Sequence, residues 1–232
     1  MNLEDLQNGQ ILLVDKPLDW TSFQAVNKLK FKIKREFKLK KIKIGHAGTL
    51  DPRATGLLIV CTGKFTKKIP EIQDAPKEYR AEIKIGVQTE SYDTEKPEIL
   101  QTDFTHISED FILKTLDAFV GEIDQKPPIF SALKIDGERA YNLARAGEQV
   151  EIKSRKITIY YINDIEVDLP FIRFTVGCSK GTYIRSLAHD IGQSLGVGAY
   201  LFNLRRTKIG VYCVEDASTE LLTNEYRFNN EE

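Results

Sequence analysis

Hydrophobic and polar residues alternate in several short stretches of the chain, and this period of two predicts β-strands. The clearest stretch is "EYRAEIKIGV", in which every second side chain is apolar, namely Tyr79, Ala81, Ile83 and Ile85. Such alternation is typical of a half-exposed strand in an antiparallel sheet. Continuous apolar runs predict buried strands in "ILLV" and "GLLIVCTG", and "KITIYYINDIEV" and "FIRFTVGC" predict two more strands that are joined by a turn at Pro170.

A period of three to four predicts helices elsewhere. Thr21 or Ser22 can cap the first helix, whose apolar stripe comprises Phe23, Val26, Leu29, Ile33 and Phe37. Ser108 caps a second helix that ends at Gly121, with the inward stripe Ile112, Leu113, Leu116, Phe119 and Val120. A third follows "SKGT", with the stripe Ile184, Leu187, Ala188, Ile191 and Leu195. Strands interrupted by a few helices, without regular alternation, predict an α+β fold with a mainly antiparallel sheet.

Charge is distributed unevenly along the 232 residues, although the formal net charge is only -1. Residues 1–68 hold 14 Lys and Arg against 6 Asp and Glu, a balance of +8, which leaves -9 for the remainder. The densest basic run is residues 28–43, with nine basic side chains and only Glu36 opposing them. This run predicts either the solvated face of a helix or a surface for a polyanion, and charge alone leaves both open.

Several function classes lack their sequence signals. The three histidines, His46, His106 and His189, are scattered without metal-ligand spacing. The chain has no Walker-type phosphate loop and no GxSxG nucleophile motif. Cys61, Cys178 and Cys213 lie in apolar runs and are expected to be reduced thiols. With no signal-like start and no membrane-length apolar run, we expect a cytoplasmic protein without a membrane partner, a metal or a nucleotide cofactor.

The stretch "GHAGTLDPRATG" concentrates glycines around Asp51 and Pro52. An aspartate before a proline is a good helix cap, but Gly56 and the predicted strand follow too soon for a helix. Glycines allow unusual backbone angles and the close approach of a ligand, so the stretch is either a turn or a site. As a site, it offers one carboxylate as nucleophile or base, whereas retaining glycosidases use two.

These residues resemble a known family, the TruB-type pseudouridine synthases or tRNA pseudouridine-55 synthases. The resemblance rests on "GHAGTLDPRATGLLIVCTGKFTK" and extends, in the family's order, through "LLVDKPLDWTS", "KEYRAEIKIGVQTESYDTEK", "QKPPIFSALKIDGERAYNLARAG", "CSKGTYIRSLAHDIGQSLG" and "LRRTKIG". It implies the pseudouridine synthase fold, a mainly antiparallel mixed sheet flanked by helices and loops. Residues 1–216 would form the catalytic domain, with an inserted RNA-clamping segment at about 125–153, and residues 217–232 a short acidic tail without a PUA domain.

The resemblance also implies a role for each site residue. Asp51 would be the catalytic nucleophile, Tyr79 would lie against the flipped uracil, and Arg185 would pair with Asp51. His46 would fill the space that the flipped nucleotide leaves. Two residues would line the base pocket, Tyr183 and Leu204, and Lys16 and Pro17 match a motif near the site.

The implied function is an isomerase that converts uridine 55 in the T-loop of tRNA to pseudouridine by base flipping, with the tRNA T-arm as partner. We expect a monomer. Isomerisation consumes no redox equivalent, nucleotide or metal, so no cofactor is expected. Two other interpretations stay open: a non-catalytic tRNA-binding or folding factor, and an aspartate-dependent glycoside or nucleoside hydrolase.

Overall fold

The computed structural model describes residues 2–130, 134–135, 138–139 and 152–228, and the chain divides into two compact units. The first unit comprises Met1–Tyr79 and Arg205–Glu232, and the second comprises Arg80–Leu204. The boundary between the units falls at residues within two strands, β4 (Lys77–Ile85) and β12 (Ala199–Ile209). No helix in the described part of the chain is both long enough and apolar enough to span a membrane.

The first unit contains strands β1, β3 and β12 in that order, with β2 paired to β3 and β13 to β12. Its other elements are helices and 3₁₀ helices. In chain order the elements are α1 (Leu3–Asn8), β1 (Ile11–Lys16), α2 (Ser22–Glu36), β2 (Ile44–His46), β3 (Ala54–Thr62), η1 (Gly63–Lys68), α3 (Ile69–Asp74), β13 (Tyr212–Cys213), η2 (Val214–Asp216) and η3 (Glu220–Leu222). β1 and β2 both run antiparallel to β3, with Leu12 opposite Val60 and Gly45 opposite Cys61.

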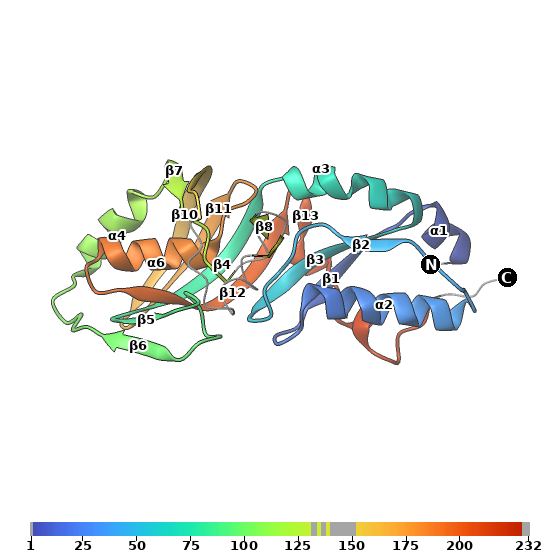
Figure 1. Cartoon of the computed structure of the whole chain (residues 1–232), viewed down its shortest axis with the longest axis horizontal. Coiled ribbons are helices and arrows are strands. Elements are labelled where there is room, and N and C mark those ends of the chain that lie inside the picture. The colour runs from blue at the N-terminus through green and yellow to red at the C-terminus, as the bar shows by residue number, and fades with distance from the viewer. Residues whose placement is uncertain (1, 131–133, 136–137, 140–151, 229–232) are drawn as a thin grey trace. The chain divides into compact units, whose positions relative to one another are not determined.

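Strand β3 is buried on both faces, as its continuous apolar run predicts. Leu58 and Val60 pack with the residues of α2, whereas Leu57 and Ile59 pack in a second cluster with Ile72 of α3. The two clusters alternate along the strand because successive side chains point to opposite faces. Figure 1 shows α2 and α3 on either side of these strands.

The predicted first helix is confirmed as α2, and Thr21 caps it. The Thr21 hydroxyl accepts a hydrogen bond from the Gln24 N–H (3.1 Å), and Gln24 accepts one from the Thr21 N–H (2.7 Å). The expected inward position of Phe23 is wrong, because this side chain is 70 % exposed. Ser22 and Ala25 occupy the buried positions instead, and successive helical residues are about 100° apart.

The second unit contains the strand order β12–β4–β11–β10–β7. Its remaining elements are β5 (Val87–Thr89), β6 (Glu98–Gln101), α4 (Glu109–Asp117), β7 (Gly121–Gln125), β8 (Lys134–Ile135), β9 (Glu138–Arg139), β10 (Arg155–Asp168), β11 (Phe171–Cys178) and α6 (Ile184–Ser194). β10 runs antiparallel to both β7 and β11, while β5 with β6 and β8 with β9 form separate antiparallel pairs. The α+β fold with a mainly antiparallel, mixed sheet is therefore confirmed.

The sequence patterns of the second unit are confirmed in β4 and α6 and fail in part in α4. The apolar positions of β4 and the predicted stripe of α6 are buried. Of the predicted stripe, Ile112 and Leu116 of α4 are buried, but Leu113 and, beyond the helix, Val120 are exposed. The helix ends at Asp117 and not at Gly121, because a turn follows in which the Val120 N–H donates to the Asp117 carbonyl (3.0 Å). The predicted inserted segment lies largely outside the described residues.

The acidic C-terminal segment packs against α2 through residues 221–228. Leu221, Leu222 and Phe228 are buried in the same cluster as α2. The Lys32 side chain of α2 is 5 % exposed, and its ammonium donates hydrogen bonds to the carbonyls of Thr223 (2.7 Å) and Leu221 (3.3 Å). The same ammonium lies 4.6 Å from the centre of the Tyr226 ring. One buried cation thus holds the C-terminal segment on the helix.

We predict that Lys32→Met lowers the free energy of unfolding by about 1–3 kcal/mol, because two carbonyls lose their donor in a largely buried place. Urea denaturation followed by circular dichroism measures the change. Lys30→Met is the matched control, since Lys30 is half-buried on the same helix. Equal losses in the two variants would contradict a specific role for Lys32.

Candidate active site

Residues 47–53 form the turn between β2 and β3 and carry Asp51. His46 lies opposite Val60, the Ala47 N–H donates to the Ile59 carbonyl (2.8 Å), and the Ala54 N–H donates to the Asp51 carbonyl (3.1 Å). Strand β3 begins at Ala54, so Asp51 and Pro52 do not cap a helix. The stretch "GHAGTLDPRATG" is therefore a strand, a tight loop and the start of a second strand.

Side chains from the segment before α2 and from its first residue hold this loop. The buried Ser22 hydroxyl accepts a hydrogen bond from the Leu50 N–H (2.8 Å) and donates one to the Leu50 carbonyl (3.1 Å). The Asp19 N–H donates to the Pro52 carbonyl (2.9 Å), and the Asp19 carboxylate accepts from the Arg53 guanidinium (2.7 Å). Both neighbours of Asp51 in the chain are therefore held by hydrogen bonds.

A buried arginine holds the same loop from β12. Arg206 is 1 % exposed, and its guanidinium donates to the carbonyls of Leu57 (2.8 Å), Gly48 (3.1 Å) and Thr49 (3.4 Å). Gly56 has a φ of +99°, and a Cβ on it would lie 2.3 Å from the Arg206 carbonyl oxygen. A glycine at position 56 is needed for this close approach of β3 to β12.

Lys16 is fully buried at the end of β1, and its ammonium donates to the carbonyls of Trp20 (2.6 Å) and Pro17 (2.9 Å). Burial lowers the pKa of Lys16 to about 8, the negative charge of Asp51 acts against that shift, and the positive charge of Arg206 adds to it. The buried ammonium and the Asp51 carboxylate therefore attract each other.

His46 and Tyr79 belong to the same unit as Asp51. The Nδ1 atom of His46 is buried and has no hydrogen-bond partner among the described residues. Burial lowers the pKa of His46, the Gly48 backbone opposes this shift, and the charge of Arg206 reinforces it, so the neutral imidazole is favoured. Tyr79 is largely buried in β4. The first unit thus contains five predicted site residues: Asp51, His46, Tyr79, Lys16 and Pro17.

The other three predicted residues, Arg185, Tyr183 and Leu204, lie in the second unit. Arg185 is 4 % exposed in the first turn of α6. Its guanidinium donates to the Phe130 carbonyl (2.9 Å), and its Nε lies 3.7 Å from the Asp93 carboxylate, which is also buried. The Asp93 carboxylate in turn accepts from the Ser91 hydroxyl (2.6 Å). These contacts hold the guanidinium from within the second unit.

Tyr183 precedes α6 and is held by its backbone. The buried Gln125 side chain accepts from the Tyr183 N–H (2.8 Å) and donates to its carbonyl (3.0 Å). The Arg155 guanidinium lies 4.8 Å from the centre of the Tyr183 ring. Leu204 is 8 % exposed in β12, at the last position of this unit.

Sequence reasoning missed the residues that support the site, above all Ser22, Asp19, Arg206 and Asp93. Each lies inside a block that carries the family resemblance, which was a usable signal for its importance. Among the described residues, no group of three or more His, Cys, Asp or Glu side chains could hold a metal ion.

Comparisons with known proteins identify the family to which this chain is similar. The family profile described as "TruB family pseudouridylate synthase (N terminal domain)" matches residues 34–184, and that of the "tRNA pseudouridylate synthase B C-terminal domain" matches residues 185–232. A tRNA pseudouridine synthase B of Flavobacterium johnsoniae is 59% identical over 94% of this chain and 95% of its own length. One of Clostridium tetani is 47% identical over 90% of this chain and 70% of its own length.

Solved structures give the same result for the fold. A chain in the crystal structure of a Cbf5–Nop10–Gar1 complex is 34% identical, with a TM-score of 0.64 over 88% of this chain. The match covers 49% of that chain, so this chain spans about half of its length. A chain in an archaeal box H/ACA sRNP Nop10–Cbf5 complex matches with a TM-score of 0.65, 31% identity, and 94% and 53% coverage of this and that chain.

We predict that Lys16 makes the unfolding free energy rise with pH above pH 8. The folded chain releases the Lys16 proton at about pH 8, whereas the unfolded chain keeps it to about 10.4, so the unfolded state binds more protons between these values. At about 1.4 kcal/mol per pKa unit, the rise reaches about 3 kcal/mol. Urea denaturation at pH 7–10.5 measures the difference between wild type and Lys16→Met.

The difference between the two curves is expected to grow as the pH rises, because the variant lacks the titrating group. Lys38→Met, at an exposed lysine after α2, is the control and is expected to follow the wild type. Parallel curves for wild type and Lys16→Met would show that Lys16 titrates as an ordinary lysine.

Proposed function

This chain belongs to the TruB family of pseudouridylate synthases, and we propose that it is a tRNA pseudouridine synthase that converts uridine 55 in the T-loop to pseudouridine. The observation that carries the proposal is the fixed loop around Asp51. Ser22 and Asp19 hold its backbone from one side and Arg206 from β12, so the backbone that carries the carboxylate is held in place before any substrate binds. A prearranged reacting group is worth several kcal/mol of activation free energy.

Asp51 acts in this proposal as the nucleophile. It forms a covalent adduct with the target uridine while the glycosidic bond moves from N1 to C5 of the base. The C–N bond breaks and a C–C bond forms, C5 loses its hydrogen, and N1 gains one, so the reaction needs no oxidant or reductant. The buried Lys16 ammonium supports an anionic nucleophile because opposite charges attract strongly where water is excluded.

The other predicted residues bind the flipped base or support the site in this proposal. Flipping a nucleotide out of the T-loop costs a few kcal/mol, which stacking and backbone contacts offset. We assign Tyr79 to stacking on the flipped uracil and His46 to the vacated space, where a neutral imidazole suits contact with bases. Arg185 is the proposed partner of Asp51, and Tyr183 and Leu204 are the proposed lining of the base pocket. Pro17 supports the site through its carbonyl, which accepts from Lys16.

The tRNA T-arm is the proposed partner, and the basic run at residues 28–43 suits its phosphates. The cytoplasmic location, the monomeric state, the lack of a cofactor and the domain limits at residue 216 stay predictions. So does the assignment of residues 125–153 as an RNA-clamping segment.

We predict that Asp51→Asn lowers pseudouridine formation at uridine 55 by about 10³-fold or more, since loss of a nucleophile removes the covalent step. Affinity for tRNA should stay within a few-fold, because the amide keeps the shape of the carboxylate. Quantitative pseudouridine detection on an unmodified tRNA transcript measures turnover, and filter binding measures affinity. Glu71→Gln, at an exposed carboxylate of α3, is the control.

The same assay separates the three candidate functions. Tight binding by the wild type without pseudouridine would favour a tRNA-binding or folding factor. Release of free uracil, followed by chromatography, would indicate a hydrolase. A large loss of binding in Asp51→Asn would mean that the carboxylate organises the loop and does not attack the substrate.

We predict that Ser22→Ala slows single-turnover pseudouridine formation by about 10- to 100-fold, because a small misplacement of a reacting group has effects of this size. The hydroxyl is a positioning group, so the tRNA dissociation constant is expected to change little. Ser194→Ala, at an exposed serine at the end of α6, is the control. An unchanged rate in Ser22→Ala would show that the loop keeps its position without this contact.

A further inference from the structure

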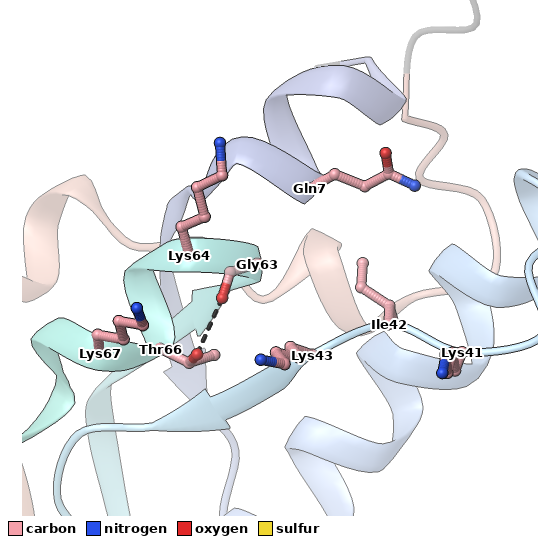
Figure 2. A pocket seen from close by; sticks show the side chains of 8 residues that line it. All are labelled: Gln7, Lys41, Ile42, Lys43, Gly63, Lys64, Thr66 and Lys67. Carbon is pink, nitrogen blue, oxygen red and sulfur yellow. Dashed lines mark hydrogen bonds between the residues drawn. The ribbon is translucent and has the colours of Figure 1, made fainter.

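A basic pocket lies in the first unit, and none of the predicted site residues lines it. Its volume is about 510 Å³, and it is lined by Gln7, Lys41, Ile42, Lys43, Gly63, Lys64, Thr66 and Lys67 (Figure 2). These residues come from α1, from the segment before β2 and from η1. Four of the eight are lysines and none is an acid. The pocket is therefore a place where positive charge gathers from segments far apart in the sequence.

Gly63 of η1 contacts both of the other segments that line this pocket, α1 and the segment before β2. Its N–H donates to the Lys43 carbonyl (2.9 Å), and its carbonyl accepts from the Thr66 hydroxyl (2.8 Å). Its φ is +49°, and a Cβ would lie 2.1 Å from the carbonyl oxygen of Gln7. Only glycine allows this backbone contact between η1 and α1. The walls are thus set by the backbone and do not depend on how the long lysine side chains are oriented.

The lysine side chains are exposed around this frame. Figure 2 shows the Lys43 amine pointing toward Thr66, with Lys41 and Lys67 on opposite sides of the view. The Lys64 ammonium donates to the Asn8 side chain (3.0 Å), which ties it to the end of α1. Four lysines among the residues that line one pocket, with no acid among them, make its surroundings positive and attract an anion. Lysine is a common ligand for phosphate, and the Thr66 hydroxyl and Gln7 amide add neutral polar groups.

We propose that this pocket binds backbone phosphates of the RNA substrate and so forms a docking site separate from the catalytic loop. The proposal rests on the proposed function for the identity of the RNA. The chemistry of the pocket suits phosphate from either an RNA backbone or a free anion. RNA is favoured because exposed basic residues continue beyond the pocket in both chain directions, at Lys38 and Lys40 and at Lys68. Exposed lysines on both sides of the pocket residues along the chain suit a polyanion better than they suit a single small ion.

The test measures tRNA affinity in two paired variants, Lys41→Gln with Lys43→Gln and Lys64→Gln with Lys67→Gln. Each pair is expected to raise the dissociation constant by about 10-fold and to reduce the dependence of log affinity on log salt by about 1 to 2 units. The single-turnover rate at saturating tRNA is expected to stay within about 2-fold, because the pocket does not contact the reacting base. The charge-matched control is Lys114→Gln with Lys156→Gln, two exposed lysines of the second unit.

Binding is measured without turnover, so this test stands even if the wild type forms no pseudouridine. A dissociation constant and salt dependence equal to those of the control pair would overturn the proposal. Inorganic pyrophosphate is the probe for a free anion, with thermal stabilisation as the readout. Stabilisation of the wild type that both paired variants lose, together with unchanged tRNA affinity, would assign the pocket to a free anion and overturn its assignment to RNA.

Discussion

The candidate site depends on the hydrogen bonds that the buried guanidinium of Arg206 donates. Its hydrogen bonds to the carbonyls of Gly48, Thr49 and Leu57 connect the loop that carries Asp51 to β12. Carbonyls in a tight loop need donors, and a buried arginine needs acceptors, so each satisfies a requirement of the other. Loss of the cation would remove the donor from three carbonyls at once, and the bond to Leu57 is fully buried. The loop therefore keeps its geometry only with the buried arginine, and the arginine is buried only because the loop supplies its acceptors.

Two further buried cations extend this pattern, Lys16 at the end of β1 and Lys32 in α2. Both donate mainly to backbone carbonyls that helices and strands leave unsatisfied. The two lysines differ in what their contacts stabilise. Lys32 holds the C-terminal segment on α2, whereas Lys16 also interacts electrostatically with Asp51. A buried cation bound to carbonyls thus stabilises the C-terminal segment in one place, and in another it places a positive charge near a candidate nucleophile.

Positively charged side chains of the first unit lie in two environments, one buried and one exposed. Arg206 and Lys16 are buried at the loop, where the low dielectric constant strengthens the electrostatic interactions of each charge. The lysines around Gly63 are exposed, and their separate charges suit long-range attraction of a polyanion. In the proposed function the first group serves the chemical step and the second serves affinity. An enzyme with this division can change its affinity for RNA without altering the geometry of the reaction.

The sequence by itself determined the α+β class, the buried strand β3, the half-exposed strand β4, the stripe of α6 and most of the stripe of α2, because hydrophobic periodicity reports which face is buried. It also singled out Asp51, through glycine spacing and family resemblance. Only the tertiary structure showed that Ser22, Asp19 and Arg206 hold the loop, since these contacts join residues up to about 160 positions apart and leave no local pattern. It also decided that Phe23 is exposed, because packing of Ser22 and Ala25 determines how α2 is rotated, and amphipathic spacing alone leaves that rotation open.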